Sequence, residues 1–154
     1  MKNPQKWFRA CNLDDIEPDS GVCVDLANRQ IAVFRVDDWV YALDNFDPAS
    51  KVNVLSRGIV GDVSGELAVA SPIYKQHFSL TTGRCLEDAE LSIPTYPVRL
   101  IDGQVWIRPD PVRLALPGKR RLVVIGNGMA GMRTVEELLK IAPQAYEIDR
   151  KSVV

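Results

Sequence analysis

Short β-branched and apolar runs, separated by turn signals, recur from the start of this chain to about Pro109. Two of them, residues 21–27 and 30–36, alternate in polarity roughly every two residues, which is the period of a half-buried strand. No segment before residue 114 has the long 3.6-residue apolar period of an amphipathic helix. Many short strands at regular spacing predict a mainly β fold, an antiparallel sandwich or barrel.

Turn residues predict two tight hairpins within this part of the chain. Asp102 and Gly103 lie between "YPVRLI" and "QVWIRP", and both residue types tolerate the positive φ angles of a type I′ turn. Asp37 and Asp38 lie between the apolar runs "AVFRV" and "WVYAL". We therefore expect antiparallel pairing across both turns.

Composition and charge exclude several classes of protein. The net charge of −1 gives no basic face for nucleic acid. No run approaches the roughly 18 apolar residues of a membrane span, and residues 1–10 lack a signal-peptide core. We expect a cytoplasmic protein with no membrane partner. Cys11, Cys23 and Cys85 are odd in number and widely spaced, which indicates free thiols and not a disulfide framework.

Two loop-like segments begin with proline-containing turns, Asp47-Pro48 and Ser71-Pro72. The pair resembles the cluster-binding region of Rieske iron–sulfur domains, in which a Cys-Pro-His box precedes a Cys-Pro-x-His box and a "GxxFxxxTG" stretch. Phe78, Thr82 and Gly83 keep the end of that pattern. Other residues stand at the four ligand positions: Asp47, Ala49, Ser71 and Tyr74.

A count of ligands supports this interpretation. A Rieske cluster needs two Cys and two His ligands, and a Cys₂His₂ zinc site needs the same number of histidines. The chain has a single histidine, His77, so it cannot supply either set alone, and we expect no metal. We expect His77 to be a loop or strand residue with a polar neighbour, and we identify no carboxylate partner nearby in sequence.

Side chains must replace the space and the cross-link that a cluster would provide. Phe46 and Tyr74 have the size to fill the gap, and Asp47 and Ser71 could join the loops through a hydrogen bond. We expect a closed, water-poor contact between the loops.

The phrases "DNFDP", "NVLSRGIVGD", "ASPIYKQHFSLTTGRCLED" and "YPVRL" resemble the small subunit of the assimilatory NAD(P)H-dependent nitrite reductase. In that family a large subunit carries FAD, an iron–sulfur cluster and sirohaem, and reduces nitrite to ammonium during nitrate assimilation. The resemblance implies that residues 1–110 are a Rieske-like accessory domain of this oxidoreductase. It implies no cofactor of the chain's own, no catalytic residue, and docking to the large subunit. Asp14, Asp15 and Glu17 could belong to a docking surface or to a solvated face.

The last residues have a different pattern. The apolar run "RLVVI" precedes a GxGxxG formed by Gly126, Gly128 and Gly131, and a helical period follows, which is the context of a dinucleotide-binding fingerprint. This stretch resembles the start of the FAD-bearing large subunit. At about 36 residues it is too short for an FAD domain, so residues 119–154 are predicted to be an incomplete βα fragment that does not bind FAD, after a linker over 111–118. Glu147 lies 21 residues after Gly126, which is a plausible separation for a ribose-binding carboxylate. Such a carboxylate should lie near the end of the second strand, however, and Glu147 lies at the start of the expected strand.

Three alternatives remain open at this point. The chain could be a Rieske-type electron-transfer protein, a fragment of a flavin-dependent pyridine-nucleotide oxidoreductase, or an interaction domain of another oxidoreductase. The missing ligands oppose the first and the short tail opposes the second. Sequence alone does not separate the third from the accessory domain, because docking surfaces have no local motif.

Overall fold

The structure, a computed structural model, describes residues 6–113, 120–125 and 146–151. The chain divides into two compact units, Met1–Leu114 and Ala115–Val154. The division falls inside the segment 111–118 that the sequence suggests as a linker.

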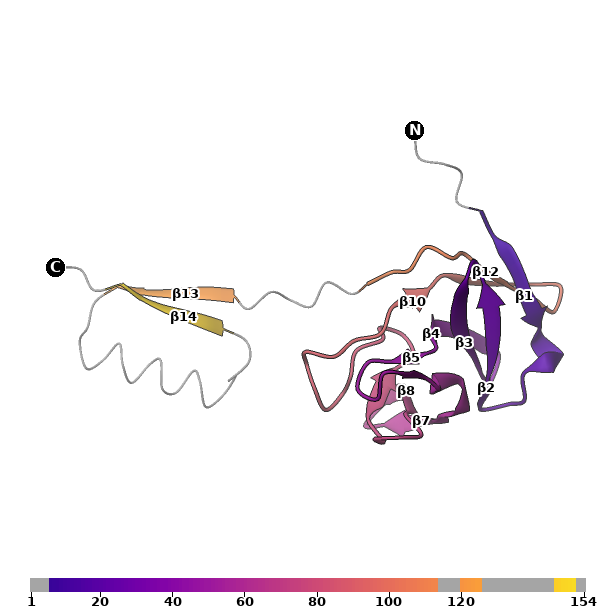
Figure 1. Ribbon diagram of the computed structural model, residues 1–154, viewed down its shortest axis with the longest axis horizontal. Coiled ribbons are helices and arrows are strands. Elements are labelled where there is room, and N and C mark those ends of the chain that lie inside the picture. The colour runs from indigo at the N-terminus through magenta and orange to yellow at the C-terminus, as the bar shows by residue number, and fades with distance from the viewer. Residues whose placement is uncertain (1–5, 114–119, 126–145, 152–154) are drawn as a thin grey trace. The chain divides into compact units, whose positions relative to one another are not determined.

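Strands and two short 3₁₀ helices form the described part of the first unit (Figure 1). In chain order they are β1 (Phe8–Asn12), η1 (Leu13–Asp15), β2 (Ser20–Leu26), β3 (Arg29–Val36), β4 (Trp39–Asp44), β5 (Phe46–Asp47), β6 (Val52–Asn53), η2 (Leu55–Arg57), β7 (Ile59–Val63), β8 (Glu66–Ala70), β9 (His77–Ser79), β10 (Thr95–Tyr96), β11 (Val98–Ile101) and β12 (Gln104–Ile107). The described residues of this unit include no α-helix. The predicted mainly β class is therefore confirmed.

The strands pair into small antiparallel sheets. The central sheet has the order β10-β4-β3-β2, and a three-stranded sheet has the order β1-β12-β11. A second three-stranded sheet, β7-β8-β9, and the two-stranded β5-β6 carry the two proline-containing loops. Each loop therefore connects two strands that pair with each other.

Strand β3 separates two hydrophobic cores, because its alternate side chains point to opposite faces. Ala32 and Phe34 belong to one core, whereas Ile31 and Val33 belong to the other. The first core is completed by Val36, Leu43, Leu55, Val69, Phe78, Leu80, Cys85 and Ile93. The second is completed by Ile16, Leu26, Ala42, Tyr96, Val105 and Ile107. The first core therefore packs β3 and β4 against the part of the domain that carries the two loops.

Both predicted hairpins are confirmed. Asp102 and Gly103 have φ angles of 51° and 72°, as a type I′ turn requires, and they connect β11 to β12. The β3–β4 turn pairs Val36 with Trp39 and places Asp37 at a φ of 50°.

The second unit contains a parallel pair of strands, β13 (Arg120–Ile125) and β14 (Tyr146–Lys151). Leu122 pairs with Ile148, so the apolar run "RLVVI" and the "YEI" segment are strands as expected. The fingerprint glycines Gly126, Gly128 and Gly131 and the helix expected after them lie outside the described residues.

Across the described ranges, no helix has both the length and the apolar character that crossing a membrane requires.

Candidate functional site: two joined loops

The first proline-containing loop is a five-residue turn that connects β5 to β6. The Lys51 N–H donates to the Asp47 carbonyl at 2.8 Å and closes the turn. Lys51 has a φ of 63°, in the left-handed region, and Pro48 is the second residue of the turn. The turn is thus closed by its own backbone.

The second loop, after β8, repeats the same construction. The Lys75 N–H donates to the Ser71 carbonyl at 3.1 Å, and Lys75 also has a φ of 63°. Pro72 is again the second residue. The Ser71 N–H donates to the Gln76 carbonyl at 2.9 Å, which ties the loop to the start of β9. Each of the two loops therefore contains a turn of the form x-Pro-x-x-Lys, closed at its lysine.

The first residues of the two turns meet inside the protein. The Ser71 hydroxyl donates to Asp47 Oδ2 at 2.5 Å, and neither residue is accessible to solvent. The hydrogen bond links positions 24 residues apart. The predicted bond between the loops is confirmed, and the contact is closed as expected.

The Asp47 carboxylate is held by a set of short hydrogen bonds. The Ala49 N–H donates to Oδ1 at 2.9 Å, and the Ser50 hydroxyl donates to Oδ2 at 2.9 Å. Burial opposes ionisation of the carboxylate, but the hydrogen bonds from Ser71, Ala49 and Ser50 outweigh it and lower the pKa of Asp47. Asp47 is therefore a buried carboxylate whose negative charge is stabilised by hydrogen-bond donors.

The expectation that aromatic side chains fill the gap between the loops is wrong. Tyr74 is 64% exposed and Phe46 is 38% exposed. The loops instead meet directly through the Asp47–Ser71 bond. Tyr74 is the fourth residue of its turn, and the turn closure leaves its side chain at the surface.

The four positions matched to cluster ligands do not fit a [2Fe-2S] cluster. They offer a carboxylate, a methyl group, a hydroxyl and an exposed phenol, where a Rieske cluster requires two thiolates and two imidazoles. The carboxylate and the hydroxyl are already bonded to each other. In the described part of the chain, no group of three or more His, Cys, Asp or Glu side chains could hold a metal ion.

Glu87 is a partner of His77 that the sequence analysis missed. The Glu87 carboxylate accepts from the His77 N–H at 2.9 Å and contacts Nδ1 of the His77 ring. The Cys85 thiol donates to the same carboxylate at 3.5 Å. The expectation that no carboxylate lies near His77 in sequence is therefore wrong, since Glu87 is 10 residues away and returns on the following loop. The expected polar neighbour of His77 is confirmed.

Asn45 is a second residue that sequence reasoning missed. Its Oδ1 accepts from the Ser56 N–H at 2.8 Å, and its Nδ2 donates to Gln30 Oε1 at 3.3 Å. Asn45 is 2% exposed, so these bonds hold the base of the first loop against β3 and η2 from within. In the sequence Asn45 lies next to Asp44 just before the loop, where polar residues are ordinary, so no local pattern marked it.

The fold and the paired loops define the class of protein. Residues 6–108 match the model of the Rieske-like [2Fe-2S] domain family, and the chain belongs to that family.

Within that family the chain is similar to nitrite reductase small subunits. It is 45% identical over 105 residues to the small subunit of nitrite reductase (NADH) of Escherichia coli K12, covering 67% of this chain and 97% of that protein. A solved structure of the nitrite reductase [NAD(P)H] small subunit from Erwinia carotovora is 42% identical, with a TM-score of 0.60, and the match covers 79% of this chain and 95% of that one.

The chain also matches part of a large subunit. It is 46% identical over 101 residues to the nitrite reductase [NAD(P)H] large subunit of Klebsiella oxytoca, which is 66% of this chain. The match spans only 11% of the length of that large subunit. A sequence of this kind therefore also occurs within a longer polypeptide that bears the large-subunit name.

Proposed function

We propose that the domain over residues 1–110 is the accessory module of an NAD(P)H-dependent nitrite reductase. It docks to the large subunit, where FAD, an iron–sulfur cluster and sirohaem carry the electrons from NAD(P)H to nitrite. It carries no cluster of its own and no catalytic residue. Its place is the cytoplasm, in nitrate assimilation.

The buried hydrogen bond between Ser71 and Asp47 is the observation that carries this proposal. The bond joins the two positions that the sequence resemblance matches to the thiolate ligands of a Rieske domain, and it cross-links the two loops. The high identity along almost the whole length of a small subunit supports the choice of parent enzyme.

The test combines a spectrum with a binding measurement. The purified chain is examined for visible absorption, iron and flavin, and is then mixed with the nitrite reductase large subunit of the same organism and run on size-exclusion chromatography. The proposal expects a colourless, iron-free protein that co-elutes with the large subunit. A brown, iron-containing protein would support Rieske-type electron transfer instead, and a yellow one would assign a flavin to the second unit.

A further inference from the structure

The two joined loops expose apolar side chains at their outer end. Tyr74 is 64% exposed, Val52 is 46% exposed and Ile73 is 45% exposed. Single exposed apolar residues are normal on protein surfaces, but Ile73 and Tyr74 lie on one turn, Val52 directly follows the other, and one hydrogen bond joins the two turns. We call this surface the paired-loop tip, and its residues are Phe46, Lys51, Val52, Ile73, Tyr74 and Lys75.

The paired-loop tip differs in charge from the rest of its domain. Residues 1–114 carry 12 Lys and Arg against 16 Asp and Glu, a net charge of −4. Within 46–53 and 71–76 the exposed charged residues are Lys51 and Lys75, and the single acidic residue, Asp47, is buried beneath them. The tip is therefore a small cationic and apolar surface on an acidic domain.

We propose that the paired-loop tip is the surface that docks to the nitrite reductase large subunit, on an apolar patch bordered by carboxylates. This inference rests on the proposed function and adds the site to it. Tyr74 would be the main anchor, because aromatic residues contribute most at the buried centre of interfaces. Lys51 and Lys75 would pair with the partner's carboxylates and guide the approach.

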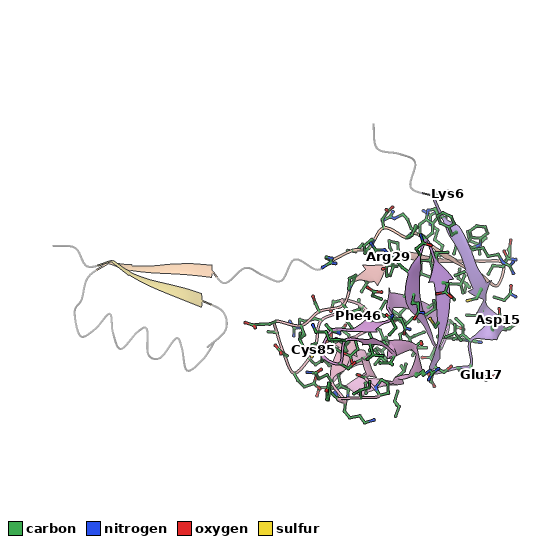
Figure 2. The ribbon with its side chains drawn as sticks, in the orientation of Figure 1. Lys6, Asp15, Glu17, Arg29, Phe46 and Cys85 are labelled. Carbon is green, nitrogen blue, oxygen red and sulfur yellow. The ribbon has the colours of Figure 1, made fainter. Side chains whose placement is uncertain are left out.

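The shape of the tip favours association. Each turn is closed by its own backbone hydrogen bond, and the Asp47–Ser71 bond fixes one turn against the other. A surface that is ordered before binding loses little conformational freedom on association. The tip lies in a different part of the domain from Asp15 and Glu17, since Phe46 and Asp15 are well separated in the side-chain view (Figure 2).

The experiment measures the affinity of the full chain for the purified large subunit of the same organism by surface plasmon resonance. Tyr74→Ser is expected to weaken binding about 30-fold, as loss of an aromatic anchor at an interface does. The double variant Lys51→Glu/Lys75→Glu is expected to associate more slowly than the unaltered chain at low salt. The difference between the two association rates should shrink at high salt.

Trp39→Ser is the matched control. Trp39 is 70% exposed and is the first residue of β4, whereas Phe46 follows the other end of that strand, in β5. This variant removes a larger exposed aromatic side chain and is expected to leave the affinity unchanged. Circular dichroism of every variant checks that the domain is folded.

Three outcomes would overturn the inference. If Tyr74→Ser binds like the unaltered chain, the docking surface lies elsewhere and the proposed function survives. If the unaltered chain shows no binding, the proposed function fails and the docking site with it. If sedimentation shows that Tyr74→Ser dissociates a dimer of this chain, the tip is covered by a second copy.

Discussion

The hydroxyl of Ser71 donates a 2.5 Å hydrogen bond to the carboxylate of Asp47, and both residues are inaccessible to solvent. The bond joins two turns that belong to different sheets. The bond therefore connects the β5-β6 sheet directly to the β7-β8-β9 sheet.

Removal of the Ser71 hydroxyl should destabilise the domain. In Ser71→Ala the buried Asp47 carboxylate loses a donor that water cannot replace, which costs about 1–3 kcal/mol. Urea denaturation measures the free energy of unfolding. Ser50→Ala is the control, because Ser50 donates to the same oxygen but is only half-buried, so water can take its place. Equal losses in the two variants would contradict the special role of the inter-loop bond.

Stability should fall in acid because of Asp47. The pKa of Asp47 is lowered in the folded protein, so its contribution is present above the unfolded pKa, about 3.9, and is lost as the pH falls through the folded pKa. Asp47→Asn removes that titration. The difference in Tm between the unaltered protein and this variant is expected to shrink as the pH falls below about 4. A difference that stays constant with pH would assign the effect to packing alone.

Two glycines with positive φ angles should respond differently to alanine. Gly83 has a φ of 75°, and a Cβ there would lie 1.9 Å from the Ile93 carbonyl oxygen. Gly103 has a φ of 72° and no atom within 4 Å of such a Cβ. Gly103→Ala should cost about 1–2 kcal/mol from backbone strain, and Gly83→Ala about 2–5 kcal/mol because overpacking is added. Thermal unfolding of both variants makes the comparison, and similar losses would show that the Ile93 segment moves aside.

The three thiols should react with iodoacetamide in the order of their exposure. Cys23 is exposed, Cys11 is half-buried and Cys85 is buried. Burial raises the pKa of the Cys85 thiol, so it is both shielded and protonated. Mass spectrometry of the native protein is expected to find Cys23 modified first and Cys85 last. Early labelling of Cys85 would indicate that the loop bearing Glu87 opens readily.

Restoring the ligand set should restore a cluster. The variant Asp47→Cys/Ala49→His/Ser71→Cys/Tyr74→His supplies two thiolates and two imidazoles on the two turns. After iron–sulfur reconstitution we expect visible absorption and about two irons per chain. The same variant with serine kept at position 71 is the control and should stay colourless. A colourless fourfold variant would mean that the turns do not hold these positions at cluster geometry.

Local patterns predicted much of this fold. The two-residue period predicted β2 and β3, and the acidic and glycine turn residues predicted the hairpins at Asp37 and Asp102, because strand and turn preferences act over a few residues. The two cores on either side of β3 could not be predicted in this way, since they depend on which sheets pack together.

The candidate site was predicted unevenly for the same reason. The Asp47–Ser71 bond could be predicted because the two loops resemble a known pair. The side chains of Phe46 and Tyr74 were wrongly expected between the loops, because the size of a side chain does not show which way it points. The partnership of Glu87 with His77 depends on the return of a loop that no local pattern specifies.

The repeated x-Pro-x-x-Lys turn has a consequence for how this surface would meet another protein. Each turn closes on itself at its lysine, so its shape is set when the domain folds and needs no ligand to template it. Recognition at such a surface should behave as lock-and-key: backbone positions at the two lysines would be the same before and after contact, and affinity would be governed by the dissociation rate and not by a slow rearrangement.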